Sequence, residues 1–252
     1  MRNRNYSNLQ DERVKDLVLN KKGYPNYPEY ILLDLIKEET VFKRGACSKY
    51  IHHEEFNTWQ EYFCGDYYEK PQGKRIAFLQ VCSWAKPYDF SYIGKKIREV
   101  TNKYPMVHPI ILSNAGIIPY EYQMNPTFCA YDWMDDIEDP VIYEELMKEY
   151  RDKLIQRIRS YLESNSYDVV VQYGIPVKKY SMAPVIKDIC KDLGITFLLT
   201  PDIETYRNNK DKLVELNDSG EFYCLDEVLS SMDNCLNKVS RYVESINCNT
   251  GL

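Results

Sequence analysis

The stretch RIAFLQVC, from Arg75 to Cys82, decides the fold of this 252-residue chain. It is a short and almost continuous apolar run, which is typical of a strand buried on both faces. A turn sequence, KPQGK, comes just before it. Residues 53–68 and 91–104 flank it and carry apolar side chains at helical spacing, so each predicts an amphipathic helix. The sequence therefore predicts a buried strand between two helices.

The same alternation of short apolar runs and helical patterns continues along the chain. Further strands are predicted at residues 106–114, 167–174 and 195–200, and further helices at residues 139–165 and 182–194. Buried strands that alternate with amphipathic helices indicate a parallel sheet covered on both faces. The predicted fold class is therefore α/β, with three layers, a parallel central sheet of about four strands, and extra helices at both ends.

Three regions are expected on this basis. Residues 1–70 form a helical extension packed on the core, with one helix predicted at residues 27–39. Residues 71–205 form the α/β catalytic core, and residues 206–252 form a mainly helical C-terminal segment.

Composition limits the classes of function. The net charge is −6, whereas a protein that binds nucleic acid over its whole surface is normally basic. No apolar run approaches the roughly 18 residues of a membrane span. The eight cysteines include no C-x2-C pair, so neither a metal site nor a cofactor is expected. Without a recognisable signal peptide the expected location is the reducing cytoplasm. The 23 tyrosines suit partly exposed surfaces, or they reflect a compositional bias of the source.

In parallel α/β sheets, ligands bind beyond the carboxyl ends of the strands. The segments at those ends are residues 82–91, 113–119 and 173–176. The fold class predicts that they converge at one edge of the sheet.

The first of these segments carries groups suited to covalent chemistry. Cys82 lies four residues before Lys86, and Tyr88 and Ser91 follow. A cysteine near a lysine and a helix N-terminus loses its proton more easily, which makes a nucleophilic thiol. Ser91 is also a good N-cap for the next helix. The alternative is a buried cysteine at a strand end, where small apolar thiols pack well.

The second segment contains Ser113, Asn114 and Gly116, small residues that allow a flat ligand to approach the backbone closely. A tight turn is the alternative interpretation. Glu121 follows and has the chemistry to accept hydrogen bonds from a base edge. Further on, Asp132 and Trp133 place a carboxylate beside a stacking surface.

The three histidines do not suggest a metal site. His108 lies within a predicted strand, which favours a core or interface role. The adjacent His52 and His53 lack metal-ligand spacing on one helical face.

Together these motifs resemble archaeosine synthases, which modify archaeal tRNA and carry the signature P-C-x3-K-P-Y-x2-S-x2-H. The stretch VCSWAKPYDFSYIG, residues 81–94, matches that signature in register at Cys82, Lys86, Pro87, Tyr88 and Ser91. Residues 111–133 resemble the family segment S-S-P-x-G-x-x-P-x-E-L with its following Y-D and D-W. The positions carried over there are Ser113, Gly116, Pro119, Glu121, Tyr131, Asp132 and Trp133. The resemblance spans roughly residues 56–200.

The resemblance implies addition of free lysine, as co-substrate, to the nitrile of 7-cyano-7-deazaguanine in tRNA, which forms an amidine. It implies Cys82 as nucleophile and Lys86 as the group that lowers the thiol pKa or holds a phosphate or carboxylate. Tyr88 and Ser91 would bind the base or donate a proton, and Glu121 or Asp132 would read the base or hold the amine. The implied core is similar to uracil-DNA-glycosylase-like domains, which hold an extruded base at their strand ends.

Two departures from the signature stand out: Val81 replaces its first proline, and Gly94 replaces its closing histidine. The sequence also lacks the transglycosylase-like region and the RNA-binding module that accompany this core in full-length members. It is therefore expected to be a stand-alone core, a diverged relative, or a subunit whose partner protein supplies tRNA binding. Two other functions remain open. One is a glycosylase or another enzyme that processes a free deazaguanine base, and the other is a non-catalytic module that binds modified tRNA.

Overall fold

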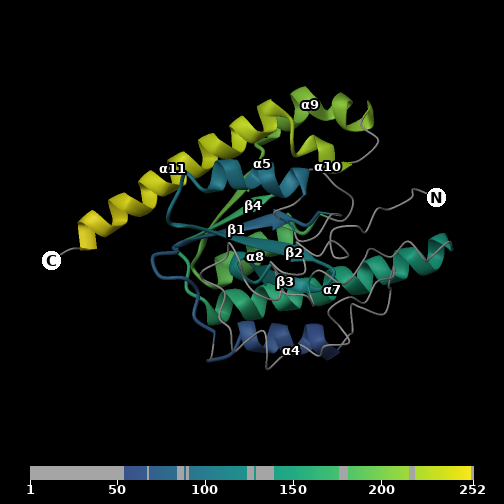
Figure 1. Cartoon of the computed structure of the whole chain (residues 1–252), viewed down its shortest axis with the longest axis horizontal. Coiled ribbons are helices and arrows are strands. Elements are labelled where there is room, and N and C mark those ends of the chain that lie inside the picture. Colours follow the sequence, from purple (N-terminus) through teal and green to yellow (C-terminus); the bar gives the residue numbers. More distant parts are fainter. Residues whose placement is uncertain are drawn as a thin grey trace, which may run out of the picture.

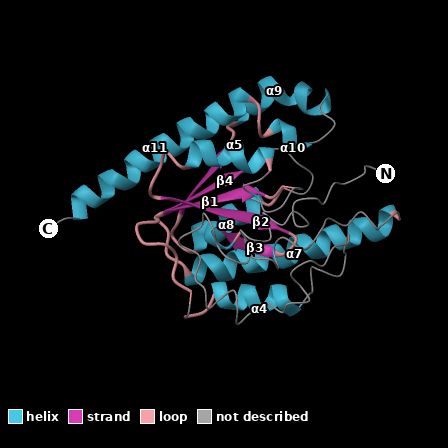
Figure 2. Ribbon diagram, in the orientation of Figure 1, coloured by secondary structure: helices cyan, strands magenta, loops and turns pink. Residues whose placement is uncertain are grey.

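The computed structural model of the chain describes residues 54–66, 68–83, 88, 91–123, 128, 139–175, 181–215 and 219–250. The helix predicted at residues 27–39 lies outside them. Within the described part, a central sheet lies between two helical layers (Figure 1). The helices α5 and α11 cover one face, and α4, α7 and α8 cover the other (Figure 2).

The described sheet has five strands in the order β3-β2-β1-β4-β5. Their bounds are β1 Ile76–Val81, β2 Val107–Ser113, β3 Gly116–Pro119, β4 Val169–Tyr173 and β5 Thr196–Thr200. The four strands predicted from apolar runs are all present and run parallel to one another. The all-parallel sheet of about four strands was wrong in one respect, because β3 pairs antiparallel with β2. The sheet is therefore mixed.

The helices follow the predicted patterns closely. Their bounds are α4 Glu54–Phe63, α5 Tyr92–Thr101, α7 Pro140–Ser164, α8 Ala183–Asp192, α9 Ile203–Glu215, α10 Ser219–Phe222 and α11 Asp226–Thr250, with a short 3-10 helix, η4, at Tyr120–Tyr122. Asp139 caps α7 by accepting a hydrogen bond from the Val141 amide, and Pro140 occupies the first turn. Gly194 follows α8 with a φ of +70°, a conformation that glycine adopts without strain.

Each face of the sheet buries its own apolar cluster. Leu79 and Val170 face α4, α7 and α8, where they join the fully buried Trp59. Phe78 and Val171 face α5 and α11. Side chains therefore alternate between the two faces along β1 and β4, as a strand's two-residue period requires.

The tyrosine-rich composition has a different meaning from the one predicted. Many tyrosines are core residues rather than surface residues: Tyr68, Tyr88, Tyr122, Tyr161, Tyr167, Tyr173 and Tyr223 are all buried. Several of their hydroxyl groups bond to one another or to a buried carboxylate, so the ring is buried at little electrostatic cost.

Candidate functional site

The order of the parallel strands identifies one place where a ligand site is expected. From β1 the chain passes through α5 to β2 on one side, and later places β4 and β5 on the other side of β1. The direction of winding therefore reverses between β1 and β4. In open α/β sheets, ligands bind outside the carboxyl ends of the strands at such a reversal. Cys82 directly follows β1 at this point.

The backbone register brings the three predicted strand ends together. Val81, the last residue of β1, pairs with Leu112 of β2. Leu79 pairs with Gln172, so the same register continued by two residues sets Gly174 beside Val81. The residues after β1, β2 and β4 thus share one edge of the sheet, as the sequence predicted. We call it the carboxyl edge and the opposite one the amino edge.

Cys82 is half-buried at this edge and packs against the apolar cluster beneath α4, α7 and α8. Its thiol interacts electrostatically with two tyrosines, Tyr150 from α7 and Tyr223 from the segment after α10. Burial, followed by the charge of Cys82, raises the pKa of Tyr150 far above its usual value. Burial also raises the pKa of Tyr223 to about 12. Both phenols therefore stay protonated at neutral pH and can donate hydrogen bonds near the thiol.

A band of buried polar side chains marks the carboxyl ends of the strands. The members are Gln80, Ser83, Ser113, Asn114, Gln172 and Thr200. In contrast, the first residues of β1 and β4 are apolar. Three members each hold a buried atom with no hydrogen-bond partner among the described residues, namely Asn114 Oδ1, Gln172 Oε1 and Thr200 Oγ1. Buried polar atoms are nearly always paired in folded proteins, so three unpaired ones at one edge point to a ligand-binding role.

The predicted ligand-binding residues of the second segment mainly build a hairpin. Ser113 Oγ accepts a hydrogen bond of 3.1 Å from the Ala115 amide, and Ser113 pairs with Gly116 across the turn. Gly116 has a φ of +106°, and a Cβ there would lie 2.7 Å from the Gln60 side chain. The tight turn that the sequence also allowed is therefore present. Asn114 is the member of this group with an unpartnered polar atom.

The structure gives Tyr88 and Ser91 roles in the loop that leads into α5. Ser91 is the N-cap: its Oγ accepts a hydrogen bond of 2.8 Å from Gly94 N and donates one of 2.6 Å to Tyr88 O. Tyr88 itself is buried. A Cβ on Gly94 would lie 2.1 Å from Tyr88 O, which is far inside contact distance. This backbone has no space for the histidine that the family signature carries here. Lys86, Asp132 and Trp133 lie outside the described residues.

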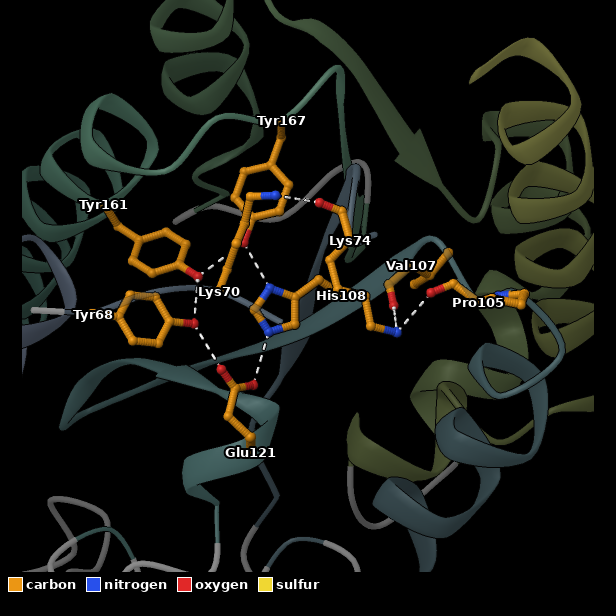
Figure 3. A network of polar contacts seen from close by, with 9 residues as sticks. All are labelled: Tyr68, Lys70, Lys74, Pro105, Val107, His108, Glu121, Tyr161 and Tyr167. Carbon is orange, nitrogen blue, oxygen red and sulfur yellow. Dashed lines mark hydrogen bonds and ion pairs between the residues drawn. The ribbon is translucent and has the colours of Figure 1, made fainter. Parts of the chain in front are cut away.

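Glu121 belongs to a different cluster, at the amino edge (Figure 3). Its Oε2 lies 2.9 Å from His108 Nε2, and its Oε1 accepts a hydrogen bond of 2.8 Å from Tyr68. His108 Nδ1 lies 2.7 Å from the Tyr167 hydroxyl. The Tyr161 hydroxyl lies 3.0 Å from the Tyr167 hydroxyl and 3.4 Å from the Tyr68 hydroxyl, which completes a closed set of contacts. We call this closed set of side chains the tyrosine ring.

The hydrogen-bond donors of the tyrosine ring find acceptors within the ring itself. Burial acts to raise the pKa of Glu121, but His108 and the hydrogen bonds from its own backbone amide and Tyr68 outweigh it, so the pKa lies below its usual value. In the tautomer with the hydrogen on His108 Nε2, Tyr161 donates to Tyr167, which donates to His108 Nδ1. The imidazole Nε2–H then donates to Glu121, which also accepts from Tyr68. Every hydroxyl hydrogen has an acceptor, which is typical of a structural network.

Two lysines border the ring on its solvent side. Lys70 Nζ lies 5.0 Å from the centroid of the Tyr167 ring, within cation–π range. Lys74 Nζ donates hydrogen bonds of 2.8 Å to Pro105 O and Val107 O. Burial lowers the pKa of both lysines from the usual value. These contacts tie the start of β1 to the start of β2.

Because the tyrosine ring lies at the amino edge, Glu121 is far from Cys82. His108 pairs with Ala77 in the sheet, and Cys82 lies five residues further along β1. At about 3.3 Å per residue the separation along the strand is about 16 Å. Because β3 runs antiparallel to β2, it returns the chain to the amino edge before Glu121. The predicted grouping of Glu121 with Cys82 is corrected by this geometry.

Several residues at the carboxyl edge escaped the sequence interpretation. Gln172 stands near the end of the apolar run VVVQY, and a buried amide at that position of a central strand was a usable signal. Tyr150 and Tyr223 come from a helix and a connection far from Cys82 in sequence, and no local pattern marks them.

Two kinds of feature are absent from the described residues. No described helix combines the length and the apolar composition that a membrane crossing needs. Nor does the described part of the chain bring together three or more His, Cys, Asp or Glu side chains in an arrangement suited to a metal ion.

Comparison with known proteins gives no family. No protein-family model matches the sequence, and no curated protein matches it. Among solved structures, the chain is similar to the crystal structure of AF0587, a protein of unknown function, at 15% sequence identity and a TM-score of 0.42. That match covers 72% of this chain and 49% of the other, so this chain spans about half of its length.

Proposed function

We propose that this protein is a tRNA-modifying enzyme that adds the amine of lysine to the nitrile of 7-cyano-7-deazaguanine. The observation that carries the proposal is the position of Cys82, directly after the central strand β1 and at the reversal of strand winding. The five-residue match of the Cys82 segment to the archaeosine synthase signature supports it from the sequence.

The chemistry needs one nucleophile and one proton donor. The thiolate of Cys82 adds to the electrophilic nitrile carbon, and the nitrile nitrogen takes a proton, which gives a thioimidate. The lysine amine then adds to the same carbon, the C–S bond breaks, and the thiolate leaves with an amidine as product. The net reaction is addition of an N–H bond across the nitrile, so no cofactor is required.

The proton donor must differ from the histidine of the family signature, because Gly94 has no room for a side chain. Tyr150 and Tyr223 take this role in the proposal. Both interact electrostatically with Cys82, and both are protonated at neutral pH, as tyrosine phenols ordinarily are. A protonated phenol that reaches the nitrile nitrogen can stabilise the negative charge that develops there.

Recognition of the whole tRNA is assigned to a local patch or to a partner protein, because the net charge of −6 does not favour a long phosphate-binding surface. The proposal includes a uracil-DNA-glycosylase-like core that holds an extruded base. A three-layer α/β arrangement with its reversal at β1 and β4 is compatible with that core.

The test compares Cys82→Ala with Cys235→Ala, a matched control on α11. Each is incubated with tRNA that contains 7-cyano-7-deazaguanine and with labelled lysine. The expected result is loss of incorporation in Cys82→Ala and wild-type incorporation in Cys235→Ala. A wild-type rate in Cys82→Ala would reject the covalent mechanism.

Two rival functions give different outcomes in the same assay. Release of free base without lysine incorporation would indicate a glycosylase-like enzyme. Tight binding of the modified tRNA without turnover would indicate a non-catalytic module. The lack of space at Gly94 is the observation that favours these rivals, since it removes a group that the family signature contains.

A further inference from the structure

We propose that Gln172 reads the base at this site, by pairing its carboxamide with the adjacent C=O and N–H of a guanine-type ring. The inference rests on the proposed function and adds a recognition residue to it. Gln172 lies on β4 beside Leu79 of β1, at the two strands between which the winding reverses. Its neighbours in the same strand, Val170 and Val171, are apolar and fully buried.

The side chain of Gln172 extends toward the carboxyl edge. A Cβ built on Gly174 would lie 3.4 Å from Gln172 Nε2 and 3.9 Å from its Cδ, so the amide covers that glycine. The sheet register sets Gly174 beside Val81, one residue before Cys82. Gln172 shares a sheet face with Leu79, whose apolar cluster is the one that Cys82 contacts. The amide and the thiol therefore lie at the same edge and on the same face.

Stability does not explain this amide. Gln172 is only 6% exposed, and within the described part of the chain its Oε1 has no hydrogen-bond partner. An unpaired buried polar atom costs about 1–3 kcal/mol, whereas an apolar side chain of similar size would be favourable there. A residue that weakens the fold at the switch point of the sheet is expected to be retained for binding.

The chemistry of a carboxamide defines the ligand that it recognises. Its oxygen accepts a hydrogen bond and its NH2 group donates one, in the same plane. Held in one orientation, the amide therefore pairs with a ring edge that presents a carbonyl and an N–H in one fixed order. A 7-deazaguanine presents its carbonyl and ring N–H in that order, whereas a 7-deazaadenine in the same position presents an amine and a bare ring nitrogen, which is the reverse order.

Asn114 supplies a second unpartnered acceptor on the other side of Cys82. It follows β2, and the β1–β2 register continued past Leu112 sets it beside Ser83. Asn114 is 4% exposed, and no described residue forms a hydrogen bond with its Oδ1. The exocyclic amine of a guanine-type ring is a donor that suits this position.

The experiment measures equilibrium binding of two probes, 7-deazaguanine and 7-deazaadenine, by isothermal titration calorimetry. Neither probe contains a nitrile, so binding is separated from chemistry. The wild-type chain is expected to prefer 7-deazaguanine by about tenfold or more, the ratio that corresponds to about 1.4 kcal/mol. Gln172→Met is expected to reduce the preference to about twofold or less. Gln172→Glu keeps the size of the side chain, removes the NH2 donor, and is expected to reduce it as well.

Ser240→Ala is the matched control, because Ser240 Oγ is also buried without a hydrogen-bond partner but lies on α11. It is expected to keep the full preference. Equal preference in wild type and both Gln172 variants would overturn the inference, and so would failure of the wild-type chain to discriminate between the probes.

A separate measurement keeps the two proposals distinguishable. Mass spectrometry of the wild-type chain with 7-cyano-7-deazaguanine reports a thioimidate on Cys82. A preference for 7-deazaguanine that depends on Gln172, without that adduct, supports the inference and rejects the covalent function. An adduct with a preference unaffected by Gln172 supports the function and overturns the inference.

Discussion

At the scale of single residues, the backbone around Gly94 explains why this position is a glycine. The sequence indicates only that a glycine replaces a histidine. The structure adds that Ser91 caps α5 and holds the Tyr88 carbonyl directly over Gly94. The cap and the glycine therefore depend on each other, and the backbone at this entry to the helix requires a glycine.

Gly94→Ala is expected to destabilise the protein by more than about 2 kcal/mol, although alanine normally favours helices. The reason is that its Cβ would lie 2.1 Å from a backbone oxygen, which cannot move without disturbing the cap. Chemical unfolding with urea gives the change in the free energy of unfolding. Lys95→Ala, at an exposed position of the same helix, should change stability by less than about 0.5 kcal/mol. Equal stability of the two variants would contradict the geometry at Gly94.

Glu121 illustrates why a residue's role cannot be predicted from its local pattern. Its carboxylate is held by His108, 13 positions away, and by Tyr68, 53 positions away. A local pattern contains neither partner, and an exposed glutamate after a loop looks the same in sequence. Only the antiparallel course of β3 brings Glu121 back to the amino edge.

Glu121→Gln is expected to lower the free energy of unfolding by about 2–4 kcal/mol at pH 7, because it breaks a buried network that is otherwise fully paired. The pKa of Glu121 is lower in the folded protein than its usual value of 4.5. Its stabilising contribution is therefore present above pH 4.5 and is lost as the pH falls through the lower folded pKa.

Urea titrations of the wild-type chain and Glu121→Gln between pH 3 and pH 7 measure both effects. The stability difference between the two proteins should shrink as the pH falls below about 4.5. Thioimidate formation on Cys82 should be unchanged by Glu121→Gln under conditions where the variant is folded. A loss of that reaction in folded Glu121→Gln would contradict the structural role and return Glu121 to the active site.

At the scale of elements, the periodicity of the sequence predicted the four parallel strands and the helices between them. It missed β3 because GIIP has only four residues and follows β2 after a two-residue turn, so its short apolar run was interpreted as part of the segment after β2. Apolar runs report burial but not chain reversal. The reversal here depends on Gly116, whose φ of +106° is strained for other residues.

The outer edge of β3 is covered by a side chain rather than by another strand. Gln60 of α4 donates from Nε2 to Ile117 O and accepts at Oε1 from Ile117 N, each at 2.9 Å. Its carboxamide thus repeats the hydrogen-bond pattern of a neighbouring strand. This contact explains how a four-residue edge strand is held in the sheet.

Gln60→Leu is expected to destabilise the protein by about 2–4 kcal/mol, because it leaves a buried N–H and a buried C=O of Ile117 unpaired. Thermal and urea unfolding measure the change. Gln156→Leu, at an exposed position of α7, is the matched control and should have an effect of less than about 0.5 kcal/mol. If Gln60→Leu were as stable as this control, the backbone of β3 would have to find other hydrogen-bond partners.

At the scale of the whole molecule, the two edges of the sheet have different polar contacts: paired side chains at the amino edge, and the proposed ligand site at the carboxyl edge. The amino edge holds the closed tyrosine ring and the Arg75–Asp168 ion pair, in which Arg75 makes two hydrogen bonds, of 2.5 and 2.8 Å, to the carboxylate. The carboxyl edge holds three of the buried polar atoms that have no hydrogen-bond partner among the described residues, those of Asn114, Gln172 and Thr200, while others, such as Ser240 Oγ, lie elsewhere. A ligand site is expected where the fold leaves groups unpaired, and rigid pairing at the opposite edge supports it.

This division predicts the order in which cysteines react across the molecule. Burial raises the pKa of Cys64, Cys190, Cys224 and Cys235 to about 11, so at pH 8 each is almost entirely a protonated thiol. Cys82 follows β1 at the carboxyl edge, where polar side chains and two tyrosines surround the proposed ligand site.

Iodoacetamide at pH 8 is therefore expected to modify Cys82 at least about tenfold faster than these four thiols, because the reagent reacts with thiolates. Peptide mapping at successive times gives the rate at each cysteine. Saturating 7-deazaguanine should slow the reaction at Cys82 and leave the rates at Cys64, Cys190 and Cys235 unchanged, since the proposed base site lies between Cys82 and Gln172. Equal rates at all five cysteines, or a rate at Cys82 that the base does not alter, would contradict a ligand site at this edge.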